Sequence, residues 1–127
     1  MINVKKLFKE FKKNKIEFFT GVPDSVLKNT NEIFLNLKKS KHIIAPNEGN
    51  AVSIAAGYHL ATKKIPLVYL QNSGLGNLIN PLTSILNNNV YSIPMIILIG
   101  WRGYKKIKDE AQHLLMGEIT PKLLKMI

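Results

Sequence analysis

Two hydrophobic periods alternate along this chain. In residues 2–14, 24–37 and 78–86, apolar side chains recur every three or four positions, which is typical of helices that bury one face. Four short apolar runs, bounded by glycine, proline or polar residues, are typical of strands and lie at 16–20, 42–45, 65–70 and 94–99. A helix rich in small residues is expected directly after the second run, from about residue 48 to 62.

Strands and helices that alternate in this way predict an α/β fold, because parallel strands are joined by right-handed crossovers through helices. We expect three layers, α/β/α, with a mostly parallel sheet in the middle. The run 42–45 predicts a buried strand, and the run 94–99 predicts a central strand covered on both faces. Residues 73–77 are expected to form a loop, and Thr120-Pro121 to begin a separate helix.

Composition narrows the class of protein. The 127 residues are enough for one domain with its own core. There is no cysteine, so a disulfide, a zinc–thiolate site and a catalytic thiol are excluded. No apolar run is long enough to span a bilayer, and the N-terminal segment has the pattern of an amphipathic helix rather than a signal peptide. We therefore expect a cytoplasmic protein with no membrane partner.

The chain is strongly basic, with a formal charge of +10. Such a charge raises the question of a nucleic acid partner. The lysines are, however, spread over separate helix faces and turns, at 5–15, 38–41, 63–64 and 105–108. This distribution favours a solvated surface. Attraction of an anionic substrate and nucleic acid binding are the lesser alternatives, and we expect no nucleic acid partner.

Polar side chains follow each predicted strand. If the strands are parallel, the loops 21–25, 47–50, 71–77 and 101–113 meet at one edge of the sheet, where ligands bind in open α/β folds. Together they provide two carboxylates, two amides, a hydroxyl and an imidazole: Asp24, Ser25, Glu48, Gln71, Asn72 and His113. Such groups suit proton transfer around a small polar ligand.

Common phosphate and metal motifs are absent. Gly74 and Gly76 are spaced as in a dinucleotide fingerprint, but Ile79 takes the place of the third glycine, and no Gly-Lys-Ser/Thr follows. The three histidines lack metal-ligand spacing, so no metal ligand is expected in this chain.

Five motifs, in this order, resemble those of the pyrimidine-binding domain of thiamine-diphosphate-dependent 2-oxo-acid decarboxylases. They are TGVPDS at 20–25, NEGNAVSIAAGYHLAT at 47–62, YLQNSGLGNLINPLTS at 69–84, YSIPMIILIGWRG at 91–103 and DEAQH at 109–113. The resemblance extends from about residue 18 to 120. It is strongest to the phosphonopyruvate decarboxylases, and the alpha subunits of sulfopyruvate decarboxylases come second. It implies the fold of that domain and thiamine diphosphate as the cofactor.

The resemblance makes Glu48 the glutamate that activates the cofactor. From the residues alone, Glu48 would be an ordinary acid in a first helical turn. In the family, its carboxyl group hydrogen-bonds a ring nitrogen of the aminopyrimidine and favours the imino tautomer, which can remove a proton from the thiazolium ring. We expect burial to favour the protonated carboxyl group, which suits a group that shares a proton.

The resemblance also implies roles for other residues at the strand ends. Asp24 is expected to be catalytic, with a helix cap as the alternative. His113 is expected to donate a proton or orient the substrate, with a surface position as the alternative. Cofactor contacts are expected from Val22, Pro23, Asn72 and Gly74 besides Glu48, and substrate contacts from Asp24, Ser25, Gln71, Asn72 and His113.

Alternatives stay open for the two amides and for a further residue, Arg102. Gln71 and Asn72 could instead satisfy the backbone of their own loop. Arg102 is a candidate for binding the anionic tail of the substrate, because the arginine fork matches a phosphonate, and a surface position is the favoured alternative.

The family holds the cofactor diphosphate and a divalent metal with a Gly-Asp-Gly motif on a separate domain, and this sequence has no Gly-Asp-Gly. We therefore expect residues 1–127 to form one pyrimidine-binding domain, incomplete at its C-terminus and inactive alone. A diphosphate-binding domain or a beta subunit would supply the missing half with Mg²⁺. An oligomer is expected, because the cofactor in this family lies between two units.

The predicted reaction converts 3-phosphonopyruvate, a small anionic 2-oxo acid, to phosphonoacetaldehyde and CO₂. One alternative is the alpha subunit of a sulfopyruvate decarboxylase, whose substrate has an anionic tail on the same carbon. Another is a non-catalytic binding or assembly module with the same fold.

Overall fold

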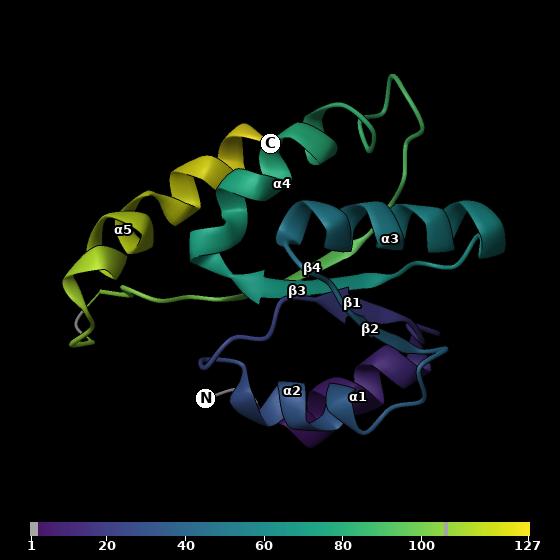
Figure 1. Cartoon of the computed structure of the whole chain (residues 1–127), viewed down its shortest axis with the longest axis horizontal. Coiled ribbons are helices and arrows are strands. Elements are labelled where there is room, and N and C mark those ends of the chain that lie inside the picture. The colour runs from purple at the N-terminus through teal and green to yellow at the C-terminus, as the bar shows by residue number, and fades with distance from the viewer. Residues whose placement is uncertain (1–2, 106) are drawn as a thin grey trace.

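The computed structural model describes residues 3–105 and 107–127, and Figure 1 shows a sheet with helices on both faces. Strands and helices alternate along the chain, as the hydrophobic periods predict. In order they are α1 (Val4–Lys13), β1 (Phe19–Gly21), α2 (Lys28–Leu35), β2 (His42–Ile44), α3 (Glu48–Thr62), β3 (Leu67–Gln71), the short 3₁₀ helix η1 (Asn72–Gly74), α4 (Leu75–Thr83), β4 (Ile96–Gly100) and α5 (Ala111–Met126).

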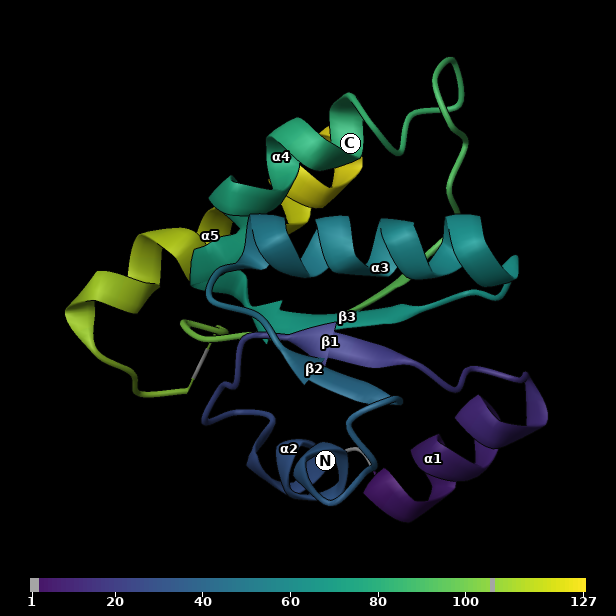
Figure 2. The ribbon, with the colours of Figure 1, turned by 45° about the vertical axis from the view of Figure 1, so that its right-hand side comes forward.

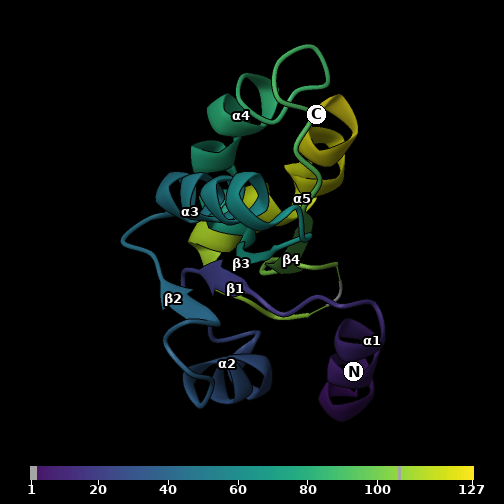
Figure 3. The ribbon, with the colours of Figure 1, turned by 90° about the vertical axis from the view of Figure 1, so that its right-hand side faces the viewer.

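The four strands form one sheet in the order β2-β1-β3-β4, and every neighbouring pair is parallel. Helices α3, α4 and α5 lie on one face of the sheet, and α1 and α2 lie on the other, as Figures 2 and 3 show. The predicted three-layer α/β/α fold is therefore confirmed.

Two hydrophobic cores share strand β3. Its side chains alternate in direction, so Val68 and Leu70 join the core beneath α3 and α4, whereas Leu67 and Tyr69 join the core formed with α1 and α2. All four residues are at most 1% exposed. Consecutive buried residues from Leu67 to Leu70 are typical of a parallel strand covered on both faces.

The outer strands are less covered than their sequences predict. The run 94–99 predicts a central strand, but β4 is an edge strand of the described sheet, and Ile96 is 37% exposed. Strand β2 forms the other edge, where Ile43 and Ile44 are exposed, so the prediction of a buried strand is wrong for these two residues. An apolar run indicates a strand that packs, but it does not show which neighbours lie beside that strand.

The segment after β3 is helical rather than a loop. Helix η1 leads directly into α4, and the N–H of Leu75 donates to the carbonyl of Asn72. The prediction of a loop at 73–77 is therefore wrong. Its two glycines indicated a flexible turn, but in the folded chain each is part of a helix.

Helix α5 continues through Thr120-Pro121, so the prediction of a separate helix there is wrong. Proline cannot donate an N–H to the carbonyl four residues earlier. That carbonyl, of Gly117, instead accepts the indole N–H of Trp101 at 3.0 Å. The hydrogen bond that proline removes is thus replaced by one from the loop after β4. No helix in the described part of the chain is both long and apolar enough to cross a membrane.

Parallel pairing places the carboxyl ends of all four strands at one edge of the sheet. Gly21 at the end of β1 pairs with Ile44 of β2 and with Tyr69 of β3, and Gln71 pairs with Gly100 at the end of β4. The loops that follow these strands therefore meet at the same edge. This is the edge where the sequence predicts the site.

Candidate functional site

Glu48 lies at the start of α3, and its carboxylate is held by the beginning of α4. The side chain of Asn47 caps α3 by accepting the N–H of Asn50 at 2.9 Å. Glu48 follows in the first turn, half-buried, and its Oε2 accepts a hydrogen bond from the amide of Asn77 at 2.7 Å. Its other oxygen lies against Gly74, where an added methyl group would overlap the carboxylate.

Asp24 lies in the loop after β1 and is buried, with 6% of its surface exposed. Its carboxylate packs against Gly100 at the end of β4, where an added methyl group would overlap it. Neither carboxylate oxygen has a hydrogen-bond partner among the described residues. Burying an unpartnered carboxyl group is costly, and such groups in folded proteins are often functional.

The loop around Asp24 is fixed from helix α2. The side-chain amide of Asn31 donates to the backbone carbonyl of Asp24 at 2.7 Å, and Asn31 is itself buried. Helix α2 begins at Lys28 without a side-chain cap, so the alternative that Asp24 is a helix cap is wrong.

An ion pair organises the loop after β4. Arg102 donates from Nε to Asp109 at 2.9 Å, and its Nη2 also contacts that carboxylate. The Nη1 atom donates to the hydroxyl of Ser25 at 3.1 Å. Hydrogen bonds from Arg102 and from the backbone N–H of Gly103 hold the pKa of Asp109 well below its usual range. The same pair raises the pKa of Arg102.

The amides of Asn72 and Gln71 are bound within the chain. Asn72 is fully buried; its Oδ1 accepts the N–H of Arg102 at 3.0 Å, and its Nδ2 donates to the carbonyl of Arg102 and the hydroxyl of Thr120. Gln71 donates to the hydroxyl of Ser73 at 2.8 Å. These bonds favour the alternative that both amides hold the loop, and their contacts with substrate or cofactor stay predictions.

His113, Val22 and Pro23 lie at the same edge of the sheet. His113 is in the first turn of α5 and partly exposed, and its carbonyl packs closely against Gly103, whose φ of +67° favours glycine. The N–H of Val22 donates to the carbonyl of Tyr69 at 3.0 Å. Pro23 and Asp24 line a cavity of about 360 Å³.

The site thus has two parts. One contains Glu48, Gly74 and Asn77; the other contains Asp24, Ser25, Gly100, Arg102 and Asp109. Helix η1 joins them, because it includes both Gly74 and Asn72, and Asn72 bonds to Arg102. Sequence reasoning assigned no role to Asn77, Gly100, Asp109 or Asn31. Asn77, Gly100 and Asp109 could have been considered from the sequence, because each lies in one of the motifs quoted above.

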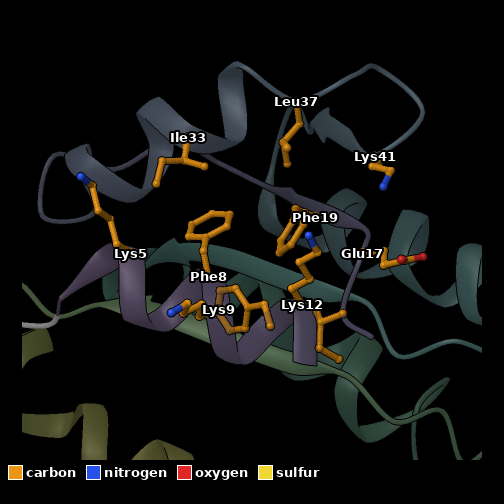
Figure 4. A pocket seen from close by; sticks show the side chains of 11 residues that line it. Lys5, Phe8, Lys9, Lys12, Glu17, Phe19, Ile33, Leu37 and Lys41 are labelled. Carbon is orange, nitrogen blue, oxygen red and sulfur yellow. The ribbon is translucent and has the colours of Figure 1, made fainter. Parts of the chain in front are cut away.

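A second cavity, of about 450 Å³, lies away from this edge, between α1 and α2 (Figure 4). Phe8, Phe19, Ile33 and Leu37 line it, and lysines lie around its rim. Its lining also includes Ile16 and Lys41, which precede β1 and β2, so it is at the amino edge of the sheet. It is therefore separate from the candidate site.

Comparisons with known proteins identify the family of this chain. Residues 3–124 match the family described as thiamine pyrophosphate enzyme, N-terminal TPP binding domain. The chain therefore belongs to this family of thiamine pyrophosphate (that is, thiamine diphosphate) enzymes.

Two relatives are decarboxylases. The chain is 40% identical over 104 residues to phosphonopyruvate decarboxylase of Streptomyces viridochromogenes, which covers 82% of this chain and 25% of that protein. It is 38% identical over 112 residues to sulfopyruvate decarboxylase subunit alpha of Methanococcus maripaludis, which covers 88% of this chain and 65% of that protein. The chain thus spans a quarter of the first relative and about two thirds of the second.

A solved structure has a similar fold. Benzoylformate decarboxylase from Polynucleobacter necessarius superimposes with a TM-score of 0.66 at 25% identity, over 84% of this chain and 19% of that protein. This likeness supports the fold assignment.

Proposed function

We propose that this chain forms the pyrimidine-binding half of a thiamine-diphosphate-dependent decarboxylase, in which Glu48 activates the cofactor. The observation that supports this most is the Glu48 carboxylate, held by Asn77 at the carboxyl edge of the sheet beside a glycine that leaves space for it. The family match and the decarboxylase relatives favour this function over a purely structural one.

The residues present fit the pyrimidine ring. Oε2 of Glu48 is bound by Asn77, whereas Oε1 has no hydrogen-bond partner among the described residues and lies beside Gly74. One carboxylate oxygen is therefore fixed, and the other can share a proton with a ring nitrogen. Val22, Pro23 and Gly74 are the further proposed contacts of the cofactor, whereas the buried amide of Asn72 would act only through the loop that it holds. When bound, thiamine diphosphate supplies the carbon nucleophile and accepts the electron pair left when CO₂ departs.

The other residues of the edge act on the substrate in this proposal. The bond between the carboxylate carbon and the keto carbon breaks, CO₂ leaves, and a proton replaces it on the keto carbon. Asp24 is buried in the loop after β1 with no hydrogen-bond partner in the part of the chain that the structure describes, and we assign it to proton transfer at this carbon. Ser25, Gln71 and His113 are the proposed substrate contacts, with His113 orienting the substrate or donating a proton.

The substrate class we propose is a 2-oxo acid with an anionic tail, first 3-phosphonopyruvate, which would give phosphonoacetaldehyde. Sulfopyruvate is the second candidate, because similarity to a sulfopyruvate decarboxylase alpha subunit is nearly as high. The diphosphate group and Mg²⁺ would be held by another domain or by a beta subunit in an oligomeric enzyme.

The test is Glu48→Gln in the complete enzyme, which means this chain together with its diphosphate-binding domain or subunit. This variant keeps the size of the side chain but cannot share a proton in the same way. We expect kcat for both 3-phosphonopyruvate and sulfopyruvate to fall at least about 100-fold, the usual contribution of general acid–base catalysis. The melting temperature should change little.

The matched control is Glu10→Gln, which makes the same chemical change at an exposed position on α1. Its activity should equal that of the wild type. Full activity of Glu48→Gln would contradict the proposed role and favour a non-catalytic module. The ratio of the wild-type rates on the two acids identifies the better substrate.

A further inference from the structure

A small cavity lies at the carboxyl edge of the sheet, beside Arg102 in the loop after β4. It has a volume of about 340 Å³, and its lining includes Ser25, Arg102, Lys108 and Asp109. Ser25 directly follows Asp24, and Arg102 lies two residues after Gly100, against which the Asp24 carboxylate packs. The cavity is therefore adjacent to the carboxyl group that we assign to proton transfer.

Arg102 is held in one orientation at this cavity. Its backbone is bound on both sides by the buried amide of Asn72. Its side chain is bound by Asp109 through Nε and Nη2 and by Ser25 through Nη1. Asp109 is fixed in turn by the N–H groups of Gly103 and Glu110, each at 2.8 Å. An arginine that only covers the surface does not need this number of constraints.

The guanidinium group still has donors to offer. Arginine has five N–H donors in a planar fork. The bonds to Asp109 and Ser25 use one on Nε, one on Nη2 and one on Nη1, so one N–H on each of Nη1 and Nη2 has no partner among residues 3–105 and 107–127. Two N–H groups of a guanidinium suit a phosphonate or sulfonate oxygen pair.

The charges at the cavity are of both signs, so binding of an anion there depends on the unpaired N–H groups of Arg102 and on Lys108 rather than on net charge. Asp109 neutralises one positive charge, and Glu110 and Asp24 also act on Arg102 from nearby. Lys108 adds a second positive charge to the lining and is exposed, so its ammonium group can move toward a ligand. The hydroxyl of Ser25 adds a neutral donor.

We propose that this cavity, which we call the tail cavity, receives the phosphonate or sulfonate group of the substrate, with Arg102, Lys108 and Ser25 as its ligands. The proposal rests on the proposed function and assigns the recognition of the acidic tail to Ser25, an expected substrate contact, together with Arg102 and Lys108. If Arg102 only fastened the loop, it would affect stability but would not distinguish substrates that have an acidic tail.

The test measures binding of 3-phosphonopropionate, which has the acidic tail but no keto group, to the complete enzyme by isothermal titration calorimetry. The variant Arg102→Gln removes the charge and keeps a side chain of similar length. Because hydrogen bonds to charged groups contribute about 1.5–3 kcal/mol, we expect the dissociation constant to rise about 10- to 100-fold. KM for 3-phosphonopyruvate should rise in parallel, with a smaller effect on kcat.

Lys9→Gln is the matched control, because it removes one positive charge from an exposed position on α1 that does not line the tail cavity. Its binding should equal that of the wild type, which separates local contacts from the effect of net charge. Loss of the ion pair with Asp109 could unfold the loop, so Lys108→Gln is measured too. Its side chain makes no hydrogen bond among the described residues, and we expect a several-fold loss of affinity.

The outcomes separate the two proposals. If the wild type decarboxylates the acidic substrate but Arg102→Gln binds 3-phosphonopropionate as tightly as the wild type, the tail cavity is wrong and the function stands. The same conclusion follows if Arg102→Gln is misfolded and Lys108→Gln binds 3-phosphonopropionate with unchanged affinity. If the wild type decarboxylates neither acid, the proposed function fails, and the tail cavity fails with it.

Discussion

At the scale of single residues, the site depends on two glycines that leave space for carboxylates. A methyl group at Gly74 would overlap the Glu48 carboxylate, and one at Gly100 would overlap that of Asp24. Glu48 follows β2, and the glycine beside it, Gly74, follows β3. Asp24 follows β1, and the glycine beside it, Gly100, ends β4. The absence of a side chain at these positions therefore fixes where each acid can lie.

Alanine substitutions in the turn after β3 test this arrangement. Gly74→Ala should displace the Glu48 carboxylate, lower kcat of the complete enzyme by at least about tenfold, and destabilise the chain by about 1–3 kcal/mol, as overpacking does. Gly76→Ala is the control, because an added methyl group there meets nothing within 4 Å. In a helix this change should be neutral or stabilise by about 0.4–1 kcal/mol. Urea denaturation and steady-state rates measure both effects, and equal behaviour of the two variants would refute the explanation.

The sequence indicated the two candidate acids more readily than the residues that contact them. Glu48 and Asp24 could be identified because each lies in a motif directly after a strand. Asn77 is 29 positions from Glu48, and its contact depends on how α3 packs against α4. Arg102 could not be ranked highly, because its pairing with Asp109 and Ser25 crosses an irregular loop that has no hydrophobic period.

At the scale of helices and strands, local pattern predicted which elements form, and tertiary contacts decided where they end. The periods of 3.6 and 2 residues identified the helices and strands and the parallel sheet. They could not show that β2 and β4 are edge strands, since exposure depends on neighbouring strands. Pro121 suggested a helix boundary, but Trp101 supplies the hydrogen bond that the proline removes.

A polar pair links two strands across a third. Nε2 of His42 on β2 and the hydroxyl of Tyr69 on β3 are 2.8 Å apart, and both side chains are buried. Strand β1 lies between them, and Gly21 has no side chain to block the ring of Tyr69. Burial lowers the pKa of His42 and raises the pKa of Tyr69 to about 12.

These shifts predict how stability changes with pH. The neutral forms are favoured in the folded state, so the contribution of Tyr69 is complete below pH 10 and is lost as the pH rises from about 10 to about 12. The contribution of His42 is complete above about pH 6.5 and is lost as the pH falls through its lowered folded pKa. Urea midpoints across this range should therefore fall in both directions.

Two variants separate the alkaline and the acid decline of the urea midpoint. Tyr69→Phe should flatten the alkaline decline, and His42→Gln should flatten the acid decline. Tyr91→Phe, at a residue that is 62% exposed, should leave the alkaline limb as in the wild type. An alkaline decline that persists unchanged in Tyr69→Phe would show that this pair is not its cause.

At the scale of the whole molecule, the proposed function makes this chain one side of a catalytic site, built at one edge of a parallel sheet. All candidate groups lie at the carboxyl edge, and the sequence has no Gly-Asp-Gly motif to hold a diphosphate. The domain prediction, one pyrimidine-binding unit at 1–127, follows from the resemblance and stays a prediction.

Complementation tests this view of the molecule. The purified 127-residue chain should release no CO₂ from 3-phosphonopyruvate or sulfopyruvate when supplied with thiamine diphosphate and Mg²⁺. Adding a chain that contains the Gly-Asp-Gly domain should restore decarboxylation, and the rate should saturate as that chain is titrated. Activity of the 127-residue chain alone would show that it holds the entire cofactor.

The shared position of β3 has a consequence for how the domain opens. This strand is hydrogen-bonded to β1 on one side and to β4 on the other, and its side chains belong to both cores. Loss of either helical layer alone leaves β3 bound to the rest of the sheet. Its backbone amides, from Val68 to Leu70, should therefore exchange with deuterium only through global unfolding, and so report the stability of the entire domain.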